Sequence, residues 1–141
     1  MSEQEGEKIF LDFKKRLNEN PHDLDAAVNL GNICYDNSEP AQAIVYYRIA
    51  LDINPNLPGV KTDMATMLWQ IDNVSHAELC FRDVIKSNPG FGNAYLNLGY
   101  LLLHAKNEVK AARAVWTDLI TGWPDDPAAT KIRELLMETM N

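Results

Sequence analysis

Four prolines, each preceded by Asn or Trp, recur along the chain at an almost constant interval. Asn20-Pro21, Asn54-Pro55 and Asn88-Pro89 are evenly spaced, and Trp123-Pro124 follows one position later than the same spacing would place it. A fixed period of this kind is the signature of repeat proteins, in which each unit packs only on its neighbours. The sequence therefore predicts an array of similar units.

Small and bulky residues recur at the same period. Leu30-Gly31, Met64-Ala65 and Leu98-Gly99 lie at equivalent positions. Tyr47, Phe81 and Trp116 also lie at equivalent positions, provided that one residue is inserted near Asn107, before Trp116. Glycine within a helix costs about 1 kcal/mol relative to alanine, which is tolerable where two helices must approach closely. We expect the aromatic residue of each unit to fill the space beside the small one.

Within each unit the apolar residues step by three or four, as on one face of a helix. Tyr95, Leu98 and Leu102 show this spacing, while Ser38-Glu39-Pro40 and Asp72-Asn73-Val74-Ser75 interrupt it. The residue before a proline avoids the α region, so each proline pair ends a helix. The predicted helical hairpins cover 22–55, 56–89 and 90–124. Amphipathic segments in 1–20 and 125–141 are predicted to cap the array, which makes eight helices.

These residues closely resemble the tetratricopeptide repeat (TPR) family. Its repeating pattern is an aromatic, then Leu-Gly, then a second aromatic, Ala, a third aromatic and Pro. The third unit fits best, through Tyr95, Leu98, Gly99, Leu102, Ala112, Trp116 and Pro124. Ala27 and Lys61 depart from the pattern where the leading aromatic is expected, and Cys34 replaces a Tyr. The resemblance implies one domain over 1–141, an all-α, right-handed α-solenoid of three repeats with capping helices at both ends.

In this family, the first helix of each hairpin lines a concave groove. Mapping those helices onto this chain gives nine candidate peptide-binding residues in three ladders that follow the repeat: Asn29, Asp63 and Asn97; Asn32, Thr66 and Tyr100; Tyr35 and Trp69; with Asn93 beside them. Amide side chains suit the backbone of an extended peptide, and aromatic rings supply rigid contact area. The alternative is that they are solvated polar positions and aromatics tucked between helices.

Charge narrows the class of partner. Thirteen Lys and Arg against twenty Asp and Glu give a net charge of −7, which disfavours nucleic acids and anionic membranes. The TPR subclass that binds chaperone tails clamps the ligand carboxylates with Lys, Arg and Asn. Asn32 matches one clamp position, but the others carry no cation: Val28, Asp63, Asn93 and Asn97. Asp25, Asp36 and Asp63 instead favour a basic or neutral segment.

Catalytic and metal-binding signals are weak. His22, His76 and His104 have no metal-ligand spacing, and no phosphate-binding or nucleophile motif is present. Cys34 occupies a packing position, whereas Cys80 is expected to be partly exposed. Asp125-Asp126-Pro127 is interpreted as a helix cap. We therefore predict no enzyme activity, no cofactor and no metal. With two distant cysteines, no signal peptide and no apolar run of about 20 residues, a cytoplasmic location is expected.

The preferred interpretation is a non-enzymatic protein-interaction module or scaffold that holds a peptide or protein segment in the concave groove. Two alternatives stay open. The segment from Trp116 to Leu136 resembles TPR segments of some bacterial c-type cytochrome assembly factors, which would make the chain an accessory subunit of a multiprotein assembly. Aromatic faces at the ends of a short array also allow self-association into a homo-oligomer.

Overall fold

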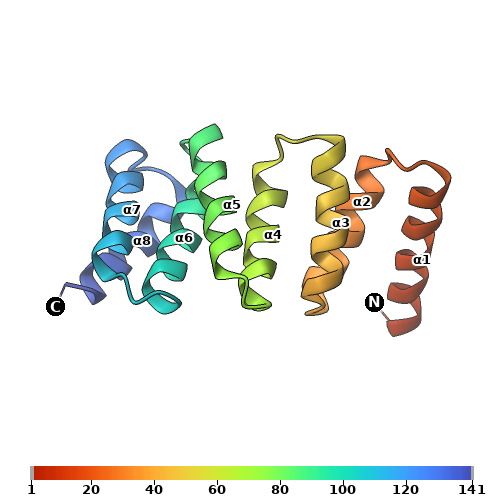
Figure 1. Cartoon of the computed structure of the whole chain (residues 1–141), viewed down its shortest axis with the longest axis horizontal. Helices are drawn as coiled ribbons and strands as arrows, with labels where there is room; N and C mark the ends of the chain where they lie inside the picture. Colours follow the sequence, from red (N-terminus) through yellow and green to blue (C-terminus); the bar gives the residue numbers. More distant parts are fainter. Residues whose placement is uncertain (1, 141) are drawn as a thin grey trace. The chain divides into compact units, whose positions relative to one another are not determined.

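The computed structural model describes residues 2–140, and this part of the chain forms eight helices and no strand (Figure 1). The helices are α1 (Glu3–Glu19), α2 (Leu24–Asp36), α3 (Pro40–Ile53), α4 (Pro58–Gln70), α5 (Val74–Ser87), α6 (Gly92–His104), α7 (Val109–Gly122) and α8 (Pro127–Glu138). The number of helices and the all-α class agree with the prediction. The chain divides into two compact units between Ile71 and Asp72, which are described separately.

The turns that follow α2, α4 and α6 share one backbone conformation. Ser38, Asp72 and Asn107 have φ values of 58°, 65° and 54°, in the left-handed region that side chains other than glycine seldom adopt. Ser38 and Asp72 are equivalent in the repeat, and Asn107 comes one position later than its own equivalent. The predicted one-residue insertion therefore lies before Asn107, within the third repeat, and the turn keeps the same conformation.

The first unit contains α1 to α4, which run alternately in opposite directions (Figure 1). At the α2–α3 hairpin, a Cβ added to Gly31 would lie 2.5 Å from two ring carbons of Tyr47, whose side chain is fully buried. The expected pairing of a small residue with a bulky one is confirmed here. In contrast, α1 packs on α2 without a buried residue of its own.

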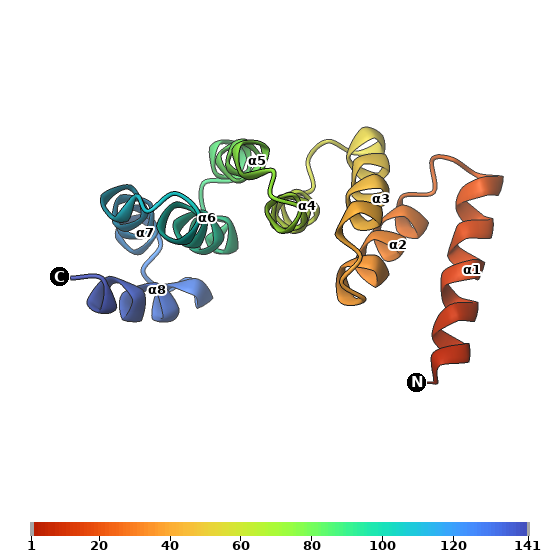
Figure 2. The same ribbon diagram turned by 60° about the horizontal axis from the view of Figure 1, so that its bottom comes forward.

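The second unit contains α5 to α8, with α8 packed against both α6 and α7 (Figure 2). A Cβ on Gly99 would overlap the buried Trp116 indole and lie 2.7 Å from its Cδ1, so α6 and α7 approach closely as predicted. Asp126 caps α8, because its carboxylate accepts a hydrogen bond of 2.8 Å from the Ala128 backbone N–H. The predicted role of Asp125-Asp126-Pro127 as a helix cap is thereby confirmed.

The two cysteines differ from expectation in one respect. Cys34 is 1% exposed, as its packing position implied, but Cys80 is also buried, at 3% exposure. The prediction of a partly exposed Cys80 is wrong because Cys80 lies in the same helical stripe as Ala77, Phe81 and Val84, all of which are buried. Both thiols thus belong to the apolar interior.

Candidate interaction surface

The structure places the nine candidate residues on three first helices. Asn29, Asn32 and Tyr35 lie on α2, and Asp63, Thr66 and Trp69 on α4, within the first unit; Asn93, Asn97 and Tyr100 lie on α6, in the second unit. Only Asn32 and Asn93 are exposed, and the other seven are partly buried. The six residues of the first unit occupy neighbouring helices, because α2 packs against α4.

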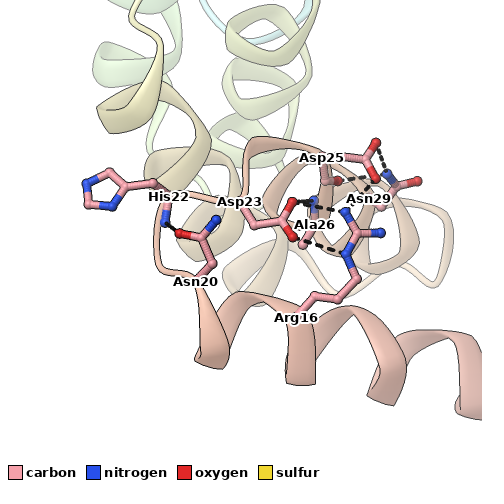
Figure 3. Close-up of polar contacts among 7 residues, drawn as sticks. All are labelled: Arg16, Asn20, His22, Asp23, Asp25, Ala26 and Asn29. Atoms are coloured by element: carbon pink, nitrogen blue, oxygen red, sulfur yellow. Dashed lines mark hydrogen bonds and ion pairs between the residues drawn. The ribbon is translucent and has the colours of Figure 1, made fainter.

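Asn29 is held in place by its own helix. Its side-chain amide donates to the Asp25 carbonyl oxygen at 2.7 Å and to the Asp25 carboxylate at 3.0 Å (Figure 3). Arg16 of α1 binds the same carboxylate at 3.1 Å. The amide nitrogen of Asn29 is therefore already engaged, and its carbonyl oxygen is the group that remains for a ligand.

Arg16 anchors the N-terminal edge of this surface. Its guanidinium forms two hydrogen bonds of 3.0 Å to the Asp23 carboxylate, which also caps α2 by accepting from the Ala26 N–H at 3.0 Å (Figure 3). These hydrogen bonds lower the pKa of Asp23, and those to Asp23 and Asp25 raise the pKa of Arg16. In the repeat register, Arg16 is equivalent to Ala50, which is buried. The register thus marked Arg16 as unusual, although sequence reasoning did not single it out.

Asn32 links the surface to the core. Its side-chain oxygen accepts a hydrogen bond of 2.7 Å from the hydroxyl of Tyr47 on α3. Burial raises the pKa of Tyr47, and the nearby Asp63 carboxylate adds to the rise. The Tyr47 hydroxyl needs this acceptor because Tyr47 is fully buried. Asn32 is thereby fixed with its NH₂ group as the donor left for a ligand.

Asp63 is the most perturbed acid of the surface. Burial raises its pKa from 3.8 to about 6, and the charge of Asp36 contributes further. Tyr35 lies in the same electrostatic neighbourhood, since burial raises its pKa and both Asp63 and Asp36 raise it further. Within residues 2–140, the Asp63 carboxylate has no hydrogen bond or ion pair. Tyr35 and Asp63 therefore influence each other electrostatically, and the Asp63 carboxylate has no counter-ion among the described residues.

The remaining candidates differ in what they offer. The Thr66 hydroxyl donates to the Thr62 carbonyl oxygen of its own helix at 3.2 Å, so its donor is used. In the second unit, Tyr100 stacks on His104, with ring centroids 6.0 Å apart, and meets Trp116 edge-on at 6.0 Å. These contacts fix the Tyr100 ring. Trp69, Asn93 and Asn97 contribute partly exposed or exposed side chains.

Metal binding and membrane insertion are two alternatives to peptide binding. Among the described residues, no three His, Cys, Asp or Glu side chains lie close enough to hold a metal ion. None of the helices over 2–140 combines the length and apolar character needed to cross a membrane. The polar and aromatic surface of the first helices is therefore the candidate site.

Comparison with known proteins identifies the family. The pattern of the tetratricopeptide repeat matches residues 13–58 and 62–127, which together make up most of the chain. The chain belongs to the tetratricopeptide repeat family. This fold is in general a non-catalytic protein-interaction module, and membership confirms the prediction of a protein-interaction scaffold.

Solved TPR structures share the architecture at low sequence identity. MamA is 16% identical, with a TM-score of 0.76 over 93% of this chain and 84% of that chain. YrrB, described as a TPR protein with an unusual peptide-binding site, is 21% identical, with a TM-score of 0.78 over 93% and 67%. The first TPR of Spaghetti, bound to the HSP90 peptide SRMEEVD, is 18% identical, with a TM-score of 0.69 over 84% and 96%. These likenesses confirm the all-α helical repeat fold.

Proposed function

We propose that the chain is a non-enzymatic interaction module that binds a basic or neutral peptide segment on the faces of its first helices. The observation that carries the proposal is the Asp63 carboxylate, which is half-buried and has no counter-ion among the described residues. A Lys or Arg side chain of the ligand would supply the missing partner, since charge-assisted hydrogen bonds are the stronger ones. Tyr35 would flank that side chain, and the NH₂ group of Asn32 would donate to the ligand backbone.

This ligand differs from the one bound by a structural neighbour. The Spaghetti domain holds SRMEEVD, a peptide with two Glu and a terminal Asp. At the corresponding clamp positions this chain has Val28, Asp63, Asn93 and Asn97, none of which is cationic. Asp36 adds to the negative charge near Asp63. A carboxylate-rich ligand would therefore meet repulsion here, whereas a basic one would relieve it.

Each unit is proposed to contribute its own part of the ligand-binding surface. Asn29, Trp69 and Thr66 would widen the surface beside Asp63 in the first unit, and the second unit would contribute Asn93, Asn97 and Tyr100. We further propose that the chain is one domain of 1–141 acting in the cytoplasm without a cofactor or metal. The accessory-subunit and self-association alternatives stay predictions.

A peptide array tests the ligand class. Matched arrays in which Lys, Gln or Glu occupies the same positions of an otherwise identical segment should show the order Lys, then Gln, then Glu. Substituting Asp63→Asn should weaken binding of the best Lys peptide about tenfold, the effect of losing one charge-assisted hydrogen bond. The control Asp12→Asn removes the same charge from the exposed side of α1 and should leave binding unchanged.

The pH dependence gives a second readout of the same experiment. Because the pKa of Asp63 is about 6, the carboxylate becomes protonated below that pH and loses its attraction for a ligand cation. Binding of the Lys peptide should therefore weaken as the pH falls from 7.5 to 5 in the wild-type protein but not in the Asp63→Asn variant. Preference for the Glu peptide, or equal loss in the Asp12→Asn control, would refute the proposal.

A further inference from the structure

The first unit has a pocket of about 500 Å³ between α1 and α3, and none of the candidate groove residues lines it. The described residues that line it combine apolar side chains with a few polar ones: Leu17, Pro21, Ile49 and Ile53, with Asn18, His22 and Asp52. The volume lies within the range of about 300–1,000 Å³ that ligand pockets usually occupy. The pocket is therefore large enough to receive a long side chain of a partner.

The charge in the pocket wall comes from Asp52. Its side chain is exposed, and within residues 2–140 its carboxylate has no hydrogen bond or ion pair. Arg48 lies one helical turn before Asp52 on α3 but does not pair with it. Among the described residues that line the pocket, none is Lys or Arg. A cation brought by a ligand would therefore be the first partner of this carboxylate.

The C-terminal ends of two helices add to the negative potential of the pocket. Both α1 and α3 end on the same side of the first unit, at the top of Figure 1, and Asn18 and Asp52 belong to their last turns. A helix C-terminus carries a partial negative charge that favours a cation beside the last turn. The last turn of α3 has no basic residue, and Arg16 in that of α1 is engaged by Asp23 and Asp25. Both helix ends therefore favour a cation in the pocket.

The second unit has an equivalent pocket, in which the chain itself supplies a cation. This pocket of about 190 Å³ lies between α5 and α7, and both Lys86 and Asp118 line it. In the repeat register, Lys86 corresponds to Asn18 and Asp118 to Ile49. A lysine and a carboxylate thus share the pocket of the second unit. The pocket of the first unit has the Asp52 carboxylate, but an amide stands where the lysine would be.

We propose that the α1–α3 pocket is a second docking site, which takes a Lys or Arg side chain from a basic segment of a partner protein. The aliphatic stem of that side chain would lie against Leu17, Ile49 and Ile53, as long basic side chains bury their stems on apolar surface. Its cationic end would pair with Asp52, and the amide oxygen of Asn18 would accept a further hydrogen bond. The site lies on α1 and α3, so it does not depend on the groove of the proposed function.

Three synthetic peptides that differ at one position, GLKLG, GLQLG and GLELG with blocked termini, test the proposal by NMR. Titration of the ¹⁵N-labelled protein with GLKLG should give saturable amide shifts at the C-terminal turns of α1 and α3, and affinity should fall in the order Lys, Gln, Glu. The same shifts should appear in Asp63→Asn protein, which separates the pocket from the groove. Asp52→Asn should weaken GLKLG binding about three- to fivefold, the effect of losing one exposed ion pair. Asp12→Asn removes the same charge from α1 outside the pocket and should leave the affinity unchanged.

The repeat also suggests a variant that supplies the cation from within the chain. Asn18→Lys introduces the residue type found at the equivalent position in the second unit, and because Asn18 is exposed the variant should fold, which circular dichroism verifies. It should weaken GLKLG binding at least about threefold, whereas Thr117→Lys adds the same charge at an exposed position on α7 and should not. Equal affinity for GLELG, shifts only outside α1 and α3, or equal weakening by Thr117→Lys would overturn the proposal. A dimer in sedimentation that Asn18→Lys dissociates would assign the pocket to a second copy of this chain and overturn it as well.

Discussion

The close approach of α6 and α7 at Gly99 allows a quantitative test of how the repeat packs. In Gly99→Ala, the new methyl group would overlap Nε1 and Cε2 of Trp116 and lie 2.7 Å from Cδ1. The indole is fully buried and its N–H donates to the Leu96 carbonyl oxygen at 3.3 Å, so it cannot move aside without loss. Overpacking of a core costs about 1–3 kcal/mol, and alanine regains about 1 kcal/mol of helix propensity.

Straining or breaking the Trp116 hydrogen bond would cost about 1 kcal/mol more. Together these effects should lower the free energy of unfolding by about 1–3 kcal/mol. Urea denaturation followed by circular dichroism measures this change. Gly122→Ala is the matched control, because a Cβ at that position would meet no described atom within 4 Å apart from its chain neighbours and the backbone of its own helix. It should leave stability unchanged or raise it by about 0.5 kcal/mol, as helix propensity alone requires.

A double-mutant cycle locates the cause of the loss. If the clash with the indole is responsible, the penalty of Gly99→Ala should shrink by at least about 1 kcal/mol in a Trp116→Phe background, where the smaller ring leaves room. A Gly99→Ala protein as stable as the wild type, or a penalty that is the same in both backgrounds, would show that the helices do not need their close contact here.

Two further predictions concern the first unit. The pKa of Asp63, raised from 3.8 to about 6, means that the native state binds the proton more tightly than the unfolded state, so this group costs stability as the pH rises through that interval. Because Asp63 is partly exposed, solvent screening reduces this cost. Asp63→Asn should raise the free energy of unfolding by about 1–2 kcal/mol at pH 7.5 and by little at pH 4. Urea titrations at the two pH values measure the difference, and an effect of the same size at both would contradict this prediction. Ser38 has φ 58°, and glycine adopts that region without the cost of about 1–2 kcal/mol that a side chain incurs. Ser38→Gly should therefore raise the unfolding free energy by about 0.5–1 kcal/mol after its greater chain entropy is subtracted, and a lower thermal midpoint than the wild type would refute it.

Most of the fold was predictable because the sequence of each repeat contains the residues that end its helices and the residues that bring its helices together. Asn-Pro pairs end helices for a steric reason, and small residues opposite aromatic ones identify which helices touch, as Gly31 with Tyr47 shows. The burial of Cys80 was predicted wrongly, although its helical spacing from the buried residues Ala77 and Val84 indicated that it is buried too. Burial of a residue is a property of the stripe that it belongs to, so its neighbour in sequence is a poor guide.

The candidate surface was only partly predictable, since residue type does not reveal which polar group is already in use. The repeat period identifies Asn29 and Asn32 as polar positions on a first helix. It does not show that Asn29 bonds to Asp25 one helical turn away, or that Asn32 bonds to Tyr47 on the next helix. The lone carboxylate of Asp63 likewise depends on what surrounds it in three dimensions. Single-sequence periodicity carries no information of that kind.

The Arg16 contacts give one end of the first unit a chemical character of its own. At the equivalent position of the repeat, α3 has the fully buried Ala50. In α1 that position is Arg16, whose partly solvated guanidinium forms ion pairs with Asp23 and Asp25. Mobile ions compete with such contacts but leave apolar ones intact. Concentrated salt should therefore loosen α1 before any other helix of this unit, so the buffer can tune how firmly this terminal segment adheres.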